Sequence, residues 1–282
     1  MRQPVPHVPP PLRERYGRVQ WILVCLVAML AGLPVLVFRM AGADLRTIID
    51  AARSDSGWDS YHTQNTSEGS LQGPAGKLLD EALAEFERHG IELSIGYRPP
   101  DLLVYRNRAI SPCHGMRSVS GAFYCSDDEQ LYLEQGFFDD LETPFGPKSQ
   151  LAQAYLVGCL TAQHLQTRMG LRDRLQDSEL TLTAAELRGL RRALQLQAAY
   201  WTGVWASRSP TVRELLRQVP IHEALREIEL VFKARSDRYS IEGGELGETF
   251  DGASAELRAS WFDLGYKSGD YGAHPELPEL TP

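Results

Sequence analysis

The 282-residue sequence predicts an α+β domain preceded by one transmembrane helix. Three observations lead to this class. Residues 21–38 carry no charge, and 18 uncharged residues are enough for a helix to cross most of a bilayer core. In the rest of the chain, the first part alternates short apolar runs with turns, and the second part repeats apolar residues every three or four positions. These two periods predict short strands followed by a mainly helical second half.

The sequence divides into five expected parts. Four arginines precede the apolar segment and three follow it closely, an excess that predicts a cytoplasmic N-terminus and a periplasmic or extracellular C-terminal domain. The parts are a cytoplasmic Pro/Arg-rich arm (1–18), a transmembrane helix that anchors the chain in the membrane (19–39), a polar linker (40–75), an exported folded domain (76–274) and a coil tail (275–282).

A cleaved signal peptide is the alternative to a retained anchor. The segment Ala41-Gly42-Ala43 has the small residues that a signal peptidase recognises, so cleavage after Ala43 stays open. The apolar run is longer than the usual 7–15 residues of a signal peptide, and Arg39 lies before the cleavage position. The sequence therefore favours a retained helix.

The charge of the chain argues against nucleic acid as a partner. The formal net charge is −8, and lysines and arginines do not cluster into a recognisable basic face. Such a chain would on average repel phosphate. We therefore expect no nucleic-acid binding.

In the first half of the domain, residues 77–89 have a helical apolar stripe that Gly90 is expected to end. Two consecutive prolines then exclude a helix, and Leu102 to Tyr105 form a short apolar run. Residues 121–125 and 129–134 follow, separated by a polar turn, and the second run alternates apolar and polar residues. The pattern predicts one strand at 102–105 and then a strand pair.

The second half of the domain is expected to be helical. Apolar residues repeat at helical spacing over 148–169. Thr183 with Glu186, and Thr211 with Glu214, have the spacing of capping boxes and predict two further helix starts. The helix from Thr211 is expected to break near Pro220 and to resume, and a last helix is expected around residues 254–270.

Four cysteines are distributed over the chain. Cys25 lies in the apolar segment and Cys159 in the helix 148–169, whereas Cys113 and Cys125 lie in a loop-rich stretch. An exported domain meets an oxidising compartment, which favours a Cys113–Cys125 disulfide. Two free buried thiols are the alternative.

Seven stretches of the sequence matter together because of their order along the chain. They are YRPPDLLVY (97–105), Cys113 with GAFYC (121–125), QLYLEQGFFDDL (130–141), AQAYLV (152–157), LQAAYWTGVWA (196–206), IHEAL (221–225) and WFDLGYKSGD (261–270). No single stretch is specific, but in this collinear order they resemble the bacterial membrane-anchored neutral zinc metallopeptidase family. The resemblance implies a zincin-like exported domain behind one membrane helix.

The same resemblance implies where the zinc site would be. In the family, AQAYLV is followed by His-Glu-x-x-His, in which two imidazoles on one helix face hold Zn²⁺ and the Glu is the general base. At these positions the sequence has Cys159, Leu160 and Gln163. The third ligand, a Glu in the family, corresponds to Gln195. We therefore expect the catalytic base and the zinc to be lost.

A different catalytic centre around Cys159 is not expected. His164 is five residues from Cys159, about 140° around a helix of 3.6 residues per turn, so it cannot act as a base for the thiol. The sequence predicts a catalytically inactive relative of the metallopeptidases that binds peptides or proteins in the cell envelope. An active metallopeptidase with an unorthodox metal site, and a purely structural envelope protein, are the alternatives.

The expected binding element is the strand formed by Leu131, Tyr132, Leu133 and Glu134. An exposed strand edge can accept an extended peptide through main-chain hydrogen bonds. The expected partner is therefore an extracytoplasmic polypeptide. Alternatively, this strand is only structural.

Overall fold

A computed structural model describes residues 69–142, 146–172, 175, 182–242, 245–246 and 253–273. The described residues belong to the unit His62–Pro282 of the chain. The expected arm (1–18), transmembrane helix (19–39), cleavage position after Ala43 and coil tail lie outside the described residues, as does most of the linker. Among the described helices, none is long and apolar enough to cross a membrane.

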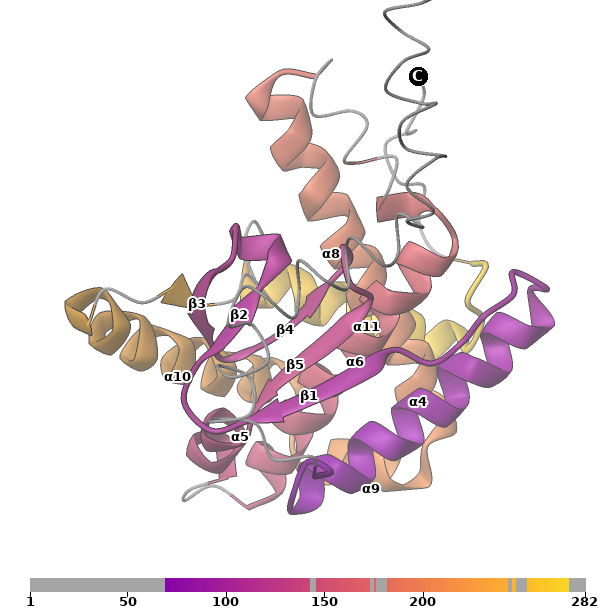
Figure 1. Ribbon diagram of the computed structural model, residues 1–282. Helices are drawn as coiled ribbons and strands as arrows, with labels where there is room; N and C mark the ends of the chain where they lie inside the picture. The colour runs from indigo at the N-terminus through magenta and orange to yellow at the C-terminus, as the bar shows by residue number, and fades with distance from the viewer. Residues whose placement is uncertain are drawn as a thin grey trace, which may run out of the picture. The chain divides into compact units, whose positions relative to one another are not determined.

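The described part is an α+β structure in which a small sheet lies against helices (Figure 1). The first sheet contains β1 (Asp101–Tyr105), β5 (Gln130–Glu134) and β4 (Ala122–Cys125) in the order β1-β5-β4. β5 pairs in parallel with β1 and antiparallel with β4, with Leu131 opposite both Leu102 and Tyr124. The expected strand and strand pair are confirmed.

A second three-stranded sheet has the order β2-β3-β6. Its strands are β2 (Ala109–Ser111), β3 (Arg117–Ser120) and the short β6 (Glu245–Leu246), and a 3₁₀ turn, η1 (Pro112–His114), joins β2 to β3. Gly121 alone separates β3 from β4 and has φ of +93°, a conformation that a side chain disfavours. The chain therefore passes from one sheet to the other at this glycine.

Helix α4 (Pro74–Glu92) begins earlier and ends later than the expected 77–89. Gly90 does not end it. A Cβ at Gly90 would lie 2.4 Å from the Tyr97 ring, so the glycine lets Tyr97 pack directly on the helix. The glycine therefore reflects a tertiary contact, which the local pattern of α4 does not reveal.

The centre of the domain is built from α6 (Pro147–Arg168), α8 (Ala184–Arg208) and α11 (Ala255–Ser268). α4 and α8 contact α6, and α11 contacts α8. The Thr183–Glu186 capping box at the start of α8 is present as predicted. α8 and α11 approach so closely that a Cβ at Gly203 would lie 2.0 Å from the Phe262 carbonyl oxygen. A Cβ at Gly265 would lie 1.9 Å from the Tyr200 carbonyl oxygen.

The remaining helices are α5 (Gln135–Glu142), α9 (Pro210–Gln218) and α10 (Ile221–Glu242). The break near Pro220 is as predicted, but the expected Thr211–Glu214 capping box is wrong. Ser209 caps α9 instead, because its hydroxyl accepts from the Val212 N–H at 3.2 Å and Pro210 occupies the first turn. The Thr211 hydroxyl donates to Glu81 of α4 at 2.8 Å.

Candidate functional site

The positions that the resemblance assigns to a zinc site lie on two neighbouring helices. Cys159, Leu160 and Gln163 belong to α6, and Gln195 belongs to α8. α6 is buried along most of its length because it packs against α4, α8 and α10. A Cβ at Gly158 would lie 2.5 Å from the Thr202 methyl group, so α6 and α8 approach closely beside Cys159.

Cys159 is enclosed in the core and is 4% exposed. The Thr202 hydroxyl donates to its sulfur at 3.4 Å. Burial raises the pKa of the Cys159 thiol to about 11. The thiol is therefore protonated at neutral pH, whereas a thiolate is the form that binds metal or attacks a carbonyl.

The other three positions offer no catalytic group. Leu160 is fully buried and Gln163 is 5% exposed. The Gln195 Oε1 atom is buried and accepts no hydrogen bond from the described part of the chain. A carboxamide carries no charge and cannot act as a general base at neutral pH.

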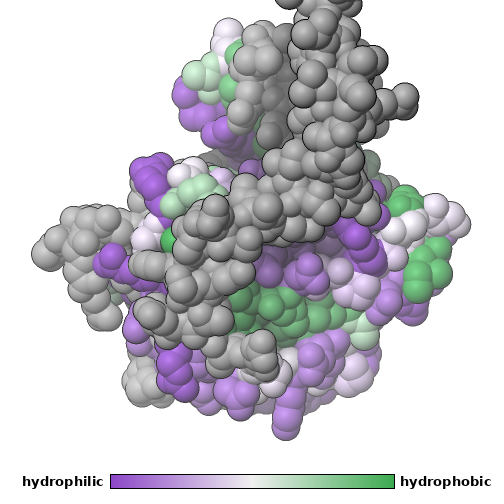
Figure 2. Space-filling view, viewed as in Figure 1, coloured by the Kyte–Doolittle hydropathy of each residue, from purple (hydrophilic) through white to green (hydrophobic). Residues whose placement is uncertain are grey.

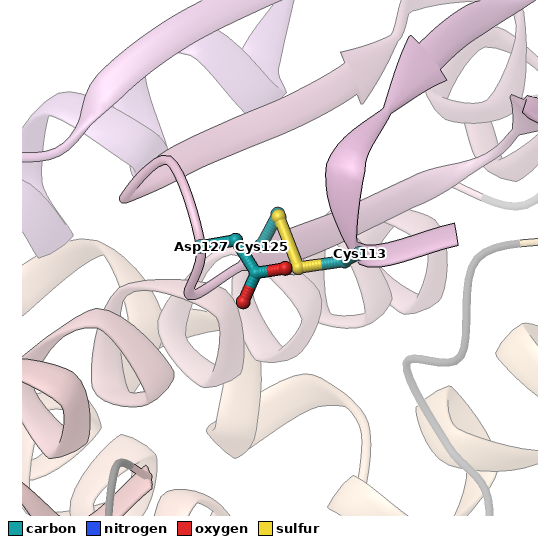
Figure 3. Close-up of side chains that lie close together, drawn as sticks. All are labelled: Cys113, Cys125 and Asp127. Carbon is teal, nitrogen blue, oxygen red and sulfur yellow. A yellow bond between two sulfur atoms is a disulfide. The ribbon is translucent and has the colours of Figure 1, made fainter. Parts of the chain in front are cut away.

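The residues present therefore do not fit zinc. Among the described residues, the only group of three or more His, Cys, Asp or Glu side chains close enough together to hold one ion is Cys113, Cys125 and Asp127. Figure 3 shows that the two sulfurs of this group are bonded to each other beside the Asp127 carboxylate. Disulfide sulfurs are not thiolates, so this group is no metal site either.

The disulfide between Cys113 and Cys125 matches the prediction from the sequence. It joins η1 to the end of β4, with Cα atoms 5.7 Å apart. Cys159 is a free buried cysteine.

His164 is a buried core residue rather than a partner of Cys159. Its Nε2–H donates to the Arg98 carbonyl oxygen at 2.7 Å, which can only accept. In that tautomer, Nδ1 accepts from the Tyr124 hydroxyl at 3.2 Å. The ring also packs edge-on against Tyr97 and Tyr124. Burial lowers the pKa of His164, so the ring is neutral at pH 7.

The expected peptide-accepting strand is not at a sheet edge, and this prediction was wrong. Leu131, Tyr132, Leu133 and Glu134 form most of β5, which pairs with β1 on one side and β4 on the other. All four residues are at most 3% exposed. The alternating pattern of the sequence identifies a strand but does not indicate how many neighbours it has.

Glu134 instead belongs to a buried ion pair that the sequence did not reveal. Its carboxylate contacts Arg235 of α10 at 2.8 Å and accepts from the Gly121 N–H at 2.7 Å. Arg235 also contacts Asp140 of α5 at 2.7 Å. This network ties α10 to β5 and α5, and its members are too far apart in the sequence for any local pattern to link them.

The space-filling view shows apolar side chains grouped beside hydrophilic ones on one face of the described domain (Figure 2). Among the large apolar side chains that are exposed, Leu102 of β1 is 41% exposed and Ile91 near the end of α4 is 64% exposed. β1 is an outer strand of its sheet, as is β4. The β4 side chains are at most 5% exposed, so β1 is the strand of this sheet that a ligand could reach.

Comparisons with known proteins agree with the resemblance of the sequence. The family described as "Putative neutral zinc metallopeptidase" matches residues 17–274. The uncharacterized protein YpfJ of Escherichia coli K12 is 29% identical over 174 residues, 62% of this chain and 60% of YpfJ. The uncharacterized protein Rv2575 of Mycobacterium tuberculosis H37Rv is 30% identical over 184 residues, 62% of this chain and 61% of Rv2575.

The aligned region spans about 60% of the length of these relatives. No solved structure is significantly similar to the chain. Because the family match covers most of the sequence, the chain belongs to the neutral zinc metallopeptidase family.

Proposed function

We propose that this protein is a non-catalytic, membrane-anchored member of the family, with a zincin-like domain that binds a polypeptide outside the cytoplasm. The observation that carries the proposal is the enclosure of Cys159, which is 4% exposed and accepts from the Thr202 hydroxyl at the position that the resemblance assigns to the first zinc ligand. Leu160 and Gln163 beside it contribute no charge and no base.

The lost groups would have supplied nearly all of the catalytic power. Zinc lowers the pKa of its bound water from 15.7 to about 7, which generates the nucleophile at neutral pH. A positioned general base adds about 10²- to 10⁴-fold to the rate. Leu160 cannot accept a proton, and the buried thiol and two carboxamides cannot replace a set of imidazoles and a carboxylate.

Two features support an exported location behind a membrane anchor. The uncharged segment within residues 19–39 has the length of a transmembrane helix. The Cys113–Cys125 disulfide suits an oxidising compartment, because such bonds are rare in the reducing cytosol.

Metal analysis and a protease assay test the proposal. We expect the full-length protein in detergent micelles, dialysed against zinc and then against metal-free buffer, to retain no stoichiometric zinc. We also expect it to leave fluorescein-labelled casein intact. Stoichiometric zinc together with cleavage that a chelator abolishes would establish an active metallopeptidase with an unorthodox site instead.

A restored variant is the matched control. The quadruple change Cys159→His, Leu160→Glu, Gln163→His and Gln195→Glu replaces each position with the family's residue type. After circular dichroism has confirmed its helical content, we expect this variant to retain zinc where the natural sequence does not. If neither protein retains zinc, the four positions are not the metal site of the family, and their side chains do not explain the inactivity.

A further inference from the structure

The Cys113–Cys125 disulfide has one accessible end and one buried end. Cys113 in η1 is exposed, whereas Cys125 at the end of β4 is fully buried. Cys125 belongs to an apolar cluster that also contains Tyr105, Phe123 and Tyr132. A reagent in solution can therefore approach this bond only from the side of Cys113.

A carboxylate lies beside the two sulfurs. Asp127, in the turn between β4 and β5, is exposed, and one of its oxygens lies within 4.8 Å of each sulfur (Figure 3). Arg117 of the neighbouring loop donates to the His114 carbonyl oxygen at 3.2 Å, and Asp127 forms no ion pair with the described part of the chain. Within that part, no direct partner neutralises the negative charge of Asp127.

Thiols break such a bond by exchange. A thiolate attacks the Cys113 sulfur, a new S–S bond forms there, and the electron pair of the old bond leaves on the Cys125 sulfur. A second thiol then attacks the mixed disulfide, so both cysteines end as thiols and the two reductant molecules end as one disulfide. Negative charge thus arrives at Cys113 and accumulates at Cys125, and Asp127 lies close to both sulfurs.

We propose that the Cys113 sulfur is a thiol-exchange site and that Asp127 makes it selective for thiols that carry positive charge. Repulsion between two unit charges at this separation slows a reaction about fourfold even in bulk water, and more where apolar side chains exclude water. A reagent with an ammonium group next to its thiolate offsets this repulsion. The inference goes beyond the proposed function, because it concerns the disulfide rather than the vestigial metal positions.

The bond matters to the fold because it constrains an unusual loop. Gly115 and Met116 follow η1 with φ of +61° and +63°, a left-handed backbone that is unfavourable for a residue with a side chain such as Met116. A main-chain bond from the Met116 N–H to the Ser111 oxygen, at 3.1 Å, closes the same loop. Reduction would therefore release η1 from β4 and allow the connection between β2 and β3 to relax.

Three small thiols of different charge test the proposal on the full-length protein in detergent. The thiolate forms of 2-mercaptoethanesulfonate, 2-mercaptoethanol and cysteamine are a dianion, a monoanion and a zwitterion. Reactions are quenched with acid, free thiols are alkylated, and tryptic peptides are analysed by mass spectrometry. Arg117 lies between Cys113 and Cys125, so the two cysteines fall in different peptides and the assay gives both the rate and the sulfur attacked.

Asp127→Asn connects the selectivity to the carboxylate. The ratio of its rate to that of the natural protein, taken for each thiol, cancels differences in reactivity between the thiols. We expect the variant to react about fourfold faster or more with the dianion, less so with the monoanion, and nearly like the natural protein with the zwitterion. Salt at about 1 M should remove most of these differences, because it shortens the Debye length to about 3 Å.

Two further variants are the controls. Asp127→Glu keeps the charge and should keep the selectivity of the natural protein. Asp263→Asn removes one negative charge from an exposed position of α11 and should react like the natural protein with all three thiols. Circular dichroism before reduction confirms that each variant has the helical content of the natural protein.

Three results would overturn the proposal. The first is that Cys113 and Cys125 are free thiols in the purified protein, and the second is a mixed disulfide on the Cys125 peptide. The third is that Asp127→Asn reacts no faster than the natural protein with the dianion. These results are independent of the zinc and casein measurements, so failure of the exchange site is distinguishable from failure of the non-catalytic assignment.

Discussion

At the residue scale, the most informative side chain is His164. It accepts from Tyr124 and donates to the Arg98 carbonyl oxygen, so the neutral ring joins α6, β4 and the segment before β1. Neither bond involves Cys159, although only five residues separate the two positions. The histidine therefore has a structural role in the zincin-like core that we propose.

His164 should make stability depend on pH in a defined direction. Its folded pKa lies below the unfolded value of about 6.5, so the unfolded state binds more protons as pH falls. The free energy of unfolding should therefore be constant above about pH 7.5 and should decrease as pH falls through 6.5. Urea unfolding of the unit His62–Pro282 between pH 5 and 8 measures this slope.

Variants separate His164 from the other titrating groups. His164→Phe should lower the free energy of unfolding at pH 8 by about 1–3 kcal/mol, because two buried polar groups lose their partner. It should also flatten the slope. His222→Gln, at an exposed position of α10, should retain the slope of the natural protein. An unchanged slope in His164→Phe would show that His164 is not the titrating group.

At the element scale, the contact between α8 and α11 depends on glycine. Gly203 and Gly265 have no room for a Cβ, because each faces a carbonyl oxygen of the other helix. Two hydrogen bonds from side chains of α8 to main-chain oxygens beyond the end of α11 extend the same contact. Tyr200 donates to the Asp270 carbonyl oxygen at 2.9 Å, and the Trp201 indole donates to that of Tyr271 at 3.1 Å.

Gly265→Ala should lower the free energy of unfolding by about 1–3 kcal/mol, since the helices must separate to admit the methyl group. Gly189→Ala is the matched control. It lies on α8 in open space, so the same change should raise the free energy of unfolding by up to about 1 kcal/mol. Urea midpoints give both values. Similar effects for the two variants would contradict the close packing of α8 and α11.

Single helices and strands are also the features that could best be predicted from the sequence. The start of α8 was predictable because the Thr183–Glu186 capping box lies within one turn. The place of β5 between two strands was not, because it depends on pairing with residues distant along the chain. The position of Cys159 on a helix, just after the stretch 152–157, could be predicted from the sequence. Its contact with Thr202, 43 residues away, required the packing of α6 on α8.

At the scale of the whole molecule, the proposed anchor and the Cys113–Cys125 disulfide predict the same topology, with the domain outside the cytoplasm. If residues 19–39 span the membrane with the N-terminus inside, alkaline phosphatase fused after Pro282 should be active and a green fluorescent protein fusion should be dark. Active phosphatase requires disulfides that form only outside the cytoplasm. A bright fluorescent fusion with inactive phosphatase would reverse the proposed orientation.

The mass of the purified protein decides between the anchor and the cleaved leader. Retention of the transmembrane helix predicts a chain that starts at its first residues. Cleavage after Ala43 predicts one that starts at Asp44. In the second case the domain would be released, and the detergent used for purification would be unnecessary.

The contact between α8 and α11 has a consequence for biosynthesis. The face of α8 that contains Tyr200 and Trp201 is covered by residues up to Tyr271, which leave the ribosome about 70 residues later. Until then these aromatic side chains lack the cover that the end of the chain supplies. If the domain is exported as proposed, a chaperone that shields aromatic segments would find a binding surface on α8 during this interval.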